Sequence, residues 1–228
     1  MLLLFDIDGT LIHAHGVGRR AIEDAMSQAA GRPIHSKGVT FAGRTDPAIA
    51  WDMLRISGVP DDECPTLVDE GLRRYSLLVD HALAEHPVTV LPGVFELLDR
   101  LSAIPTVRIA LLTGNLESSA YAKLRSGGLD SYFPFGAFGS DHADRYRLPF
   151  IALGRAWTFT GRRYAPDECI ILGDTEHDVG CGRGAGMRTV AVCTGPHDRV
   201  TMESHGADLV LDDFSAPSAL FGMLDLAI

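Results

Sequence analysis

The sequence predicts an α/β protein: a doubly wound, Rossmann-like parallel sheet that carries a small inserted α-helical domain. Two observations lead to this prediction. Short apolar runs that end at polar or glycine residues alternate with helical patterns, and the stretch 16–86 shows helical patterns alone. Continuous runs rich in leucine and β-branched residues are typical of strands that are buried on both faces of a parallel sheet.

The individual strands and helices follow from these runs. We expect strands at 2–5, 107–112, 169–172, 189–193 and 209–211. Helices are expected between them, at 94–101, 116–126, 148–158 and 178–184. Strands that alternate with helices in this way form one parallel sheet through right-handed crossovers.

The stretch 16–86 is expected to form a helical cap domain, and residues 1–15 and 87–228 the α/β core. Its longest helix is indicated by apolar residues at helical spacing, namely Val68, Leu72, Tyr75, Val79 and Leu83. In an open parallel sheet, ligands bind at the carboxyl ends of the strands. Because the insertion leaves the chain at that edge, we expect it to cover the site as a lid.

The formal net charge of the chain is -10 at pH 7. A broad acidic surface repels phosphodiester backbones, so nucleic acid is not an expected partner. The same field repels a small phosphate ester. An anionic substrate therefore needs a local positive charge to overcome that field, and a bound divalent cation would supply it.

The sequence predicts a cytoplasmic protein without a membrane segment. The apolar start 1–5 is interrupted by Asp6, and no segment approaches the roughly 18 apolar residues of a transmembrane helix. No obvious apolar stripe indicates an interface, so we expect a monomer or a weak dimer. The sequence has no CxxC pair. We therefore interpret the four cysteines as reduced core thiols; they are Cys64, Cys169, Cys181 and Cys193.

The first polar motif, Asp6-Ile7-Asp8-Gly9-Thr10, directly follows the first expected strand. A carboxylate at a strand end can attack a phosphoryl group and form an aspartyl-phosphate. The second carboxylate can give a proton to the leaving alcohol and then take one from the hydrolytic water. The alternative interpretation is an Asp-Gly surface turn.

The second motif, Thr113-Gly114-Asn115, follows the strand expected at 107–112. A hydroxyl group and free backbone N–H groups at a strand-to-helix turn can bind phosphate oxygens. We therefore expect Thr113 to act on the phosphoryl group and Gly114 and Asn115 to contact the substrate. The alternative is a helix N-cap that satisfies orphan backbone donors.

The third motif runs from Gly173 to Asp178, after the strand expected at 169–172. Asp174 would join Asp6 in holding Mg²⁺, a hard ion that prefers about six oxygen ligands and keeps several waters. Helix capping by the acidic residues is the alternative. His177 is not expected to be a ligand, because nitrogen suits zinc better and no second histidine stands at metal-site spacing.

Taken together, the three motifs resemble those of the haloacid-dehalogenase superfamily, and the resemblance covers nearly the whole chain. Asp6 and Asp8 match its DxDGT signature, Thr113 its second-strand Ser/Thr, and Asp174 with Asp178 its GDxxxD signature. The resemblance implies that Asp6 is the nucleophile and Asp8 the general acid and base. It also implies that Mg²⁺ binds the carboxylates of Asp6 and Asp174 and the backbone carbonyl of Asp8, with Asp178 in support.

That superfamily expects a cation, usually lysine, ahead of the helix that precedes the third motif. The sequence there reads Arg145-Tyr146-Arg147-Leu148-Pro149, and Arg147 is the predicted cation because it directly precedes a helix start that contains proline. A guanidinium can neutralise a phosphoryl group, but its shape differs from that of an ammonium. Arg145 and Lys123 are the alternatives, although Lys123 is expected on a solvated helix face.

Within the insertion, Gly43-Arg44-Thr45-Asp46 opens an expected helix. Gly43, Arg44 and Thr45 are predicted to bind the carboxylate or phosphate of a substrate. The segment resembles the specificity loop of phosphoglycolate phosphatase-like members of the superfamily. A plain Asp N-cap beside an exposed arginine is the alternative.

These features predict a Mg²⁺-dependent phosphatase that hydrolyses a small phosphate monoester, phosphoglycolate-like at the level of the family. A nucleotide monophosphate and a sugar phosphate are alternative substrates. A sugar phosphomutase shares the same core and is an alternative activity. A catalytically idle, phosphate-binding regulatory protein is a third hypothesis, since a fold alone does not establish activity.

Overall fold

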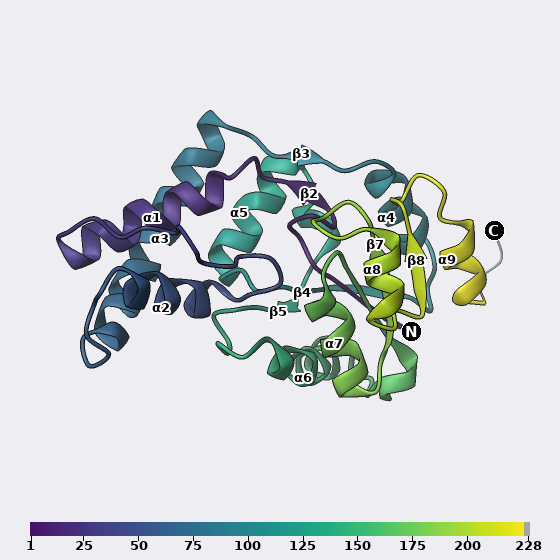
Figure 1. The fold of residues 1–228 in the computed structure, drawn as a ribbon. Coiled ribbons are helices and arrows are strands. Elements are labelled where there is room, and N and C mark those ends of the chain that lie inside the picture. Colours follow the sequence, from purple (N-terminus) through teal and green to yellow (C-terminus); the bar gives the residue numbers. More distant parts are fainter. Residues whose placement is uncertain (226–228) are drawn as a thin grey trace.

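The computed structural model describes residues 1–225 and contains a six-stranded parallel sheet with helices on both faces (Figure 1). The strand order is β5-β4-β1-β6-β7-β8. The bounds of the strands are β1 (Leu2–Phe5), β4 (Arg108–Leu112), β5 (Gly136–Ala137), β6 (Cys169–Gly173), β7 (Arg188–Val192) and β8 (Leu209–Leu211). The five expected strands are present within a residue at either end, and within this sheet the sequence missed the two-residue β5.

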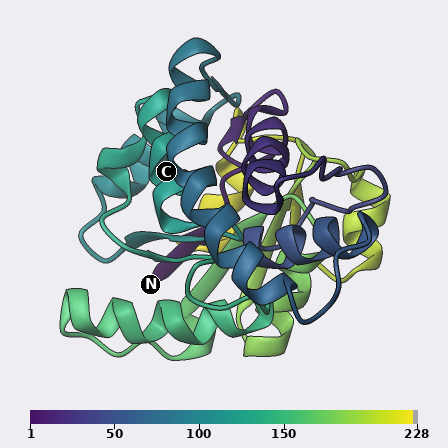
Figure 2. The same ribbon diagram turned by 90° about the vertical axis from the view of Figure 1, so that its left-hand side faces the viewer.

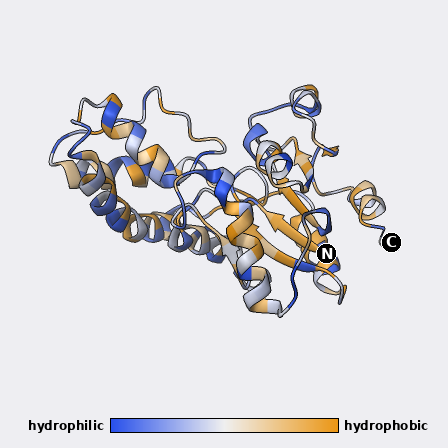
Figure 3. Ribbon diagram, turned by 90° about the horizontal axis from the view of Figure 1, so that it is seen from below, coloured by the Kyte–Doolittle hydropathy of each residue, from blue (hydrophilic) through white to orange (hydrophobic). Residues whose placement is uncertain are grey.

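The helices cover the two faces of this sheet because successive side chains of a strand point in opposite directions. Leu3 and Phe5 pack with α4 (Val94–Ser102), α5 (Glu117–Gly127) and α9 (Ser218–Met223). Leu2 and Leu4 pack with α6 (Leu148–Thr160) and α7 (Glu176–Ala185) on the other face. The strands are accordingly mainly apolar (Figure 3), which explains the continuous apolar runs in the sequence. The predicted fold class is confirmed.

Three shorter helical segments and a further helix complete the core. The helix α8 (Arg199–Ser204) packs through Met202 against Ala191 and Val210 of the outer strands. The 3₁₀ turns η1 (Asp130–Tyr132), η2 (Arg145–Arg147) and η3 (Pro166–Glu168) lie in the connections before β5, α6 and β6. Of these, η2 bears on the functional site.

The helices α1 (Val17–Ala30), α2 (Asp46–Ile56) and α3 (Cys64–Glu85) form a separate layer with its own hydrophobic cluster. They lie at one end of the sheet, where α3 packs against α5 (Figures 1 and 2). Helices α1 and α3 approach closely at Gly71, where an added Cβ would lie 2.2 Å from the sulfur of Met26. Residues 16–86, all of them described, contain no strand.

Two short strands join the helical layer to the sheet. β2 (Ile12–His13) and β3 (Thr89–Val90) pair antiparallel, one on each connection. His15, with φ of 49°, and Gly16, with φ of 75°, turn the chain into α1. Strands of two residues carry no readable periodicity, and the sequence did not predict them.

All four cysteines have free thiols, as predicted, and three of them are buried. Burial raises the pKa of the Cys169 and Cys181 thiols to about 12. Because the thiolate is the reactive form, these two side chains are chemically inert core residues.

Within residues 1–225, the structure has no helix that combines the length and the apolar character required to cross a membrane.

Candidate active site

Asp6 lies at the end of β1, where the chain makes a tight turn. Its backbone N–H donates to the carbonyl of Leu172, and its side chain is 7% exposed. The turn closes when the carbonyl of Ile7 accepts from three successive backbone amides and Gly9 donates to the carbonyl of Ile12. Gly9 has φ of 79°, a conformation that favours glycine. The first motif is therefore a rigid turn, and it presents Asp6 from the central strand.

Asp174 follows β6 and lies between two glycines. A Cβ on Gly9 would come within 2.2 Å of its carboxylate, and a Cβ on Gly195 within 1.8 Å. Thr10 Oγ1 donates to Oδ1 of Asp174 over 3.2 Å. This close packing fixes the Asp174 carboxylate against the turn that carries Asp6.

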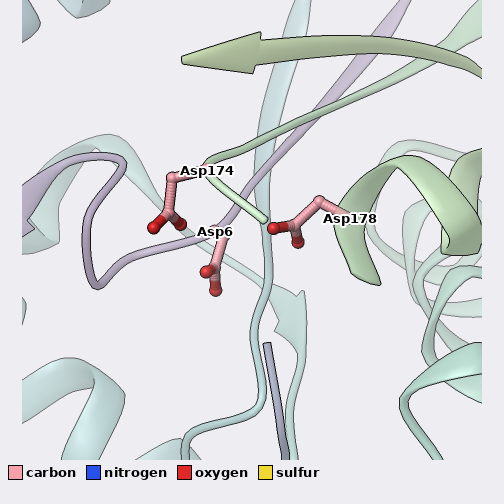
Figure 4. A group of neighbouring side chains, drawn as sticks. All are labelled: Asp6, Asp174 and Asp178. Atoms are coloured by element: carbon pink, nitrogen blue, oxygen red, sulfur yellow. The ribbon is translucent and has the colours of Figure 1, made fainter. Parts of the chain in front are cut away.

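Asp178 lies in the first turn of α7 and has two roles. Its Oδ2 accepts from the backbone N–H and the hydroxyl of Thr175 at 3.1 and 2.7 Å, so it caps the helix as the alternative interpretation held. Its Oδ1 accepts from Arg145. The carboxylate also approaches Asp6 and Asp174 (Figure 4), and one oxygen from each of the three lies within 4.8 Å of the others.

Arg145 is the buried cation of this cluster. Its Nη2 lies 3.3 Å from Oδ1 of Asp6 and pairs with Asp178, and its side chain is 5% exposed. Burial raises the pKa of Asp6 to about 6 and the pKa of Asp174 well above its usual range. Neighbouring carboxylates add to both rises, and the positive charge of Arg145 opposes them. One guanidinium does not balance three carboxylates. The buried, all-oxygen, anionic set fits a hard divalent cation such as Mg²⁺.

The carboxylate of Asp8 lies apart from this cluster. Its Oδ2 accepts from Asn115 Nδ2 at 2.8 Å and from Lys123 Nζ at 2.6 Å. Its side chain is 41% exposed, and it lines a cavity of about 260 Å³. The sheet contributes Asp6, Asp8, Thr113, Asn115 and Asp174 to this cavity, and the helical layer contributes Arg19, Phe41, Arg44 and Tyr75.

A family model described as haloacid dehalogenase-like hydrolase matches residues 1–186. That span contains the three motifs that converge on the cavity, including Asp6, Thr113 and Asp174. The chain belongs to the haloacid dehalogenase-like hydrolase family. The resemblance noted from the motifs is thereby confirmed over most of the chain.

Two curated relatives of this hydrolase match along most of their length. A phosphoglycolate phosphatase of Pectobacterium atrosepticum is 28% identical over 225 residues, which cover 96% of this chain and 92% of that protein. The pyrophosphatase PpaX of Oceanobacillus iheyensis is 22% identical over 221 residues and covers 92% of each chain.

Solved structures share the fold of this hydrolase. CbbY from Rhodobacter sphaeroides, determined in complex with phosphate, superposes with a TM-score of 0.73 at 21% identity and covers 95% of each chain. A haloacid dehalogenase-like protein of Streptococcus pneumoniae superposes with a TM-score of 0.68 at 18% identity, covering 96% of this chain and 97% of the other.

The cation of the site differs from the prediction. Arg147 was predicted, but its side chain is 67% exposed and its Nε lies 3.9 Å from Asp144, away from the cavity. Arg145 lies in the cluster instead. Both belong to the 3₁₀ turn η2, in which three residues make one turn, so positions two apart point to different sides. The prediction of Arg147, which rested on its place just before the helix start that contains Pro149, was therefore wrong.

Lys123 also differs from the prediction of a solvated helix face. Its side chain is 5% exposed. The helix α5 packs against the sheet on one side, and α3 of the helical layer packs on another. Neighbours on both sides leave α5 with less solvated surface than its sequence indicates.

The second motif contributes its side chains to the cavity and does not cap a helix. Thr113 is fully buried, and its Oγ1 accepts from Asn115 Nδ2 at 2.8 Å. The helix that follows, α5, is capped from the helical layer: Asp46 accepts from the backbone N–H of Leu116 at 2.8 Å and from Ser119 Oγ at 3.2 Å. The sequence did not reveal this contact, because a cap between segments so distant leaves no local signal.

The loop of Gly43 to Asp46 lies directly on the core. A Cβ on Gly43 would lie 2.4 Å from the ring of His177, and one on Gly114 would lie 2.0 Å from the carbonyl oxygen of Arg44. Gly43, Arg44 and Gly114 line the cavity, and Arg44 pairs with Asp52 at 2.8 Å.

Thr45 has a different role from the one predicted. It is buried, forms the N-cap of α2 by accepting from Ala48 N–H, and donates to the carbonyl of Ala143 over 2.6 Å. It does not line the cavity, so its placement is that of a helix cap and an anchor to the core. It is Thr45, and not Asp46, that caps α2.

Proposed function

We propose that this hydrolase is a phosphatase that cleaves a small phosphate monoester through an aspartyl-phosphate on Asp6, with Mg²⁺ as its cofactor. One observation carries the proposal: the buried Asp6 carboxylate lines a cavity beside Arg145, Asp174 and Asp178. Asp8 lines the same cavity but lies outside this cluster of carboxylates. The family membership and the phosphatases among the relatives support it.

The two carboxylates of the first motif supply the two chemical roles. A carboxylate oxygen of Asp6 attacks phosphorus while the bond to the leaving oxygen breaks, and that oxygen takes a proton from Asp8. Water then attacks phosphorus, the bond to Asp6 breaks, and Asp8 takes the proton from the water. Inorganic phosphate leaves, and both side chains return to their starting states.

The carboxylates of Asp6 and Asp174 and the backbone carbonyl of Asp8 would hold Mg²⁺, with Asp178 in support. When bound, the ion supplies positive charge that offsets the charge of the transferred phosphoryl group. Thr113 and the backbone amides that follow β4 would donate to phosphoryl oxygens. Arg145 orients Asp6 and adds a second positive charge beside it.

The helical layer sets the size of the substrate. A cavity of about 260 Å³ suits a small molecule, and its walls carry the cations of Arg19 and Arg44. A small ester with a second anionic group, such as phosphoglycolate, matches these features. One of the curated relatives is a phosphoglycolate phosphatase.

The test is phosphate release from a panel of phosphate monoesters, including phosphoglycolate, with Mg²⁺ or with EDTA. Wild type and Asp6→Asn are compared, with Asp24→Asn as a control because Asp24 is an exposed carboxylate on α1. The proposal expects release that requires Mg²⁺, disappears in Asp6→Asn and persists in Asp24→Asn. No release from any ester, or a sugar phosphate isomerised without free phosphate, would contradict it.

A further inference from the structure

Lys123 is a buried cation that the reaction described above leaves without a role. Its Nζ donates to Oδ2 of Asp8 and to Oδ1 of Asn115, each over 2.6 Å. An ammonium has three donors and no acceptor, and burying it without partners is costly. Two of the three N–H donors of Lys123 bind Asp8 and Asn115, and both of these residues line the cavity.

The contacts of Lys123 belong to a small network around Asp8. Asn115 Nδ2 donates to the same Oδ2 of Asp8 at 2.8 Å and to Thr113 Oγ1 at 2.8 Å. Lys123 in turn binds the amide oxygen of Asn115, which fixes the orientation of that amide. Oδ2 of Asp8 thus accepts two hydrogen bonds, and within residues 1–225 no protein donor reaches Oδ1.

The helical layer closes over the ammonium. A Cβ on Gly18 of α1 would lie 3.2 Å from Tyr75 Oη and 3.6 Å from Lys123 Nζ. Asp46 of the helical layer also lies near this ammonium. Burial raises the pKa of Asp46, and the positive charge of Lys123 opposes that rise. The Lys123 ammonium, with a side chain 5% exposed, is therefore shielded from water, so water competes little for the hydrogen bonds that it donates.

We propose that Lys123 is a positioning residue for Asp8: it holds Oδ2, so that Oδ1 is the oxygen that exchanges protons with the substrate and with water. This inference rests on the proposed function, in which Asp8 is the general acid and base. The two buried cations then serve different carboxylates, since Arg145 contacts Asp6 and Asp178 while Lys123 contacts Asp8.

The test compares Lys123→Met with Lys37→Met. Methionine resembles lysine in length but has no donor, and Lys37, the only other lysine of the chain, is exposed. Release of the alcohol is followed in single turnovers with an alkyl phosphate and with p-nitrophenyl phosphate. An alkoxide needs a proton in order to leave, whereas nitrophenolate needs little help.

For Lys123→Met, we expect release from the alkyl phosphate to slow by about 10- to 100-fold, a share of what general acid catalysis supplies. Release from p-nitrophenyl phosphate should slow by less than about threefold, with little change in KM. Lys37→Met should match the wild type. An equal loss with both esters, or no loss, would overturn the inference.

A double-mutant cycle with Asp8→Asn separates positioning from a purely structural role. If Lys123 acts through Asp8, then adding Lys123→Met to Asp8→Asn should lower the rate by less than about threefold further. A full multiplicative loss would point to a structural role and would refute the inference. If Lys123→Met does not fold, Lys123→Arg takes its place, because it keeps the charge but displaces the donors.

The outcomes for the wild type distinguish this inference from the proposed function. If the wild type hydrolyses no ester, both fail, because there is then no proton transfer for Lys123 to support. If the wild type hydrolyses the alkyl phosphate and depends on Asp8, while Lys123→Met behaves like the wild type, only the role of Lys123 fails.

Discussion

The Nη2 atom of Arg145 lies 3.3 Å from Oδ1 of Asp6, and both residues line the cavity. Both side chains are buried, and the same nitrogen pairs with Asp178. A guanidinium in this position holds two carboxylates in place and offsets part of their mutual repulsion. It therefore connects the proposed nucleophile to the third motif.

The first prediction concerns the identity of this cation. Arg145→Met should lower kcat by about 100-fold or more, because charge stabilisation at the phosphoryl group is a major part of such catalysis. It should also destabilise the fold by about 3–5 kcal/mol, the range for breaking a buried ion pair. Steady-state kinetics and thermal unfolding measure the two effects.

Arg147→Met is the matched control for that experiment, because Arg147 is an exposed arginine on the same 3₁₀ turn. Its kcat and its Tm should stay close to those of the wild type. A loss of activity in Arg147→Met that equals the loss in Arg145→Met would show that the assignment of the cation is wrong.

The second prediction concerns the metal. Mg²⁺ at about 100 times its Kd should stabilise the wild type by about 2.7 kcal/mol through mass action. For a chain of this size that corresponds to a rise in Tm of about 5–10 °C. Asp174→Asn should abolish the rise, because it removes one of the three clustered carboxylates. Glu96→Gln, which changes an exposed carboxylate on α4, should keep it.

The third prediction concerns the close contact between the helical layer and the sheet. In Gly114→Ala the new Cβ would lie 2.0 Å from the carbonyl oxygen of Arg44, and backbone yields less easily than a side chain. The loop 43–46 would have to move, which we expect to cost about 1–3 kcal/mol and to lower kcat/KM by about tenfold.

Gly154→Ala is the control for that substitution. Gly154 is an exposed residue of α6, and a Cβ added there would have no neighbouring atom within 4 Å. Alanine at this position should stabilise the protein by up to about 1 kcal/mol through helix propensity and leave activity unchanged. If Gly114→Ala is also as active and as stable as the wild type, then the position of the loop 43–46 does not depend on its close approach to Gly114.

The fourth prediction concerns pH. Burial raises the pKa of Asp46 to about 6, so the folded state binds its proton more tightly than the unfolded state does. The stability that this proton provides is present in full at low pH and is lost as pH rises through about 6. Asp46→Asn should therefore gain about 1 kcal/mol relative to the wild type between about pH 5 and pH 7.5.

Denaturant unfolding of the two proteins at both pH values measures this difference. Asp52→Asn provides a comparison on the same helix, where Asp52 pairs with Arg44 at a half-exposed position. A difference between wild type and Asp46→Asn that stays constant with pH would mean that Asp46 does not titrate in this window.

The sequence alone determined five of the six strands of the parallel sheet, four of the helices that flank it, and the sheet edge at which the polar motifs meet. Continuous apolar runs such as 2–5 and 169–172 report burial on both faces, and the polar residues that follow them lie at the carboxyl ends of parallel strands. For this reason the convergence of Asp6, Thr113 and Asp174 was predictable without coordinates.

Only the tertiary structure decided which side chains complete the site. The rotation of η2 decides whether Arg145 or Arg147 enters the site. Lys123 is buried because α3 packs against α5. Asp46 has its role because it meets the end of a helix that is distant in the chain. Sequence periodicity reports neighbours a few residues away. These three side chains owe their environments to segments that meet only in the folded chain.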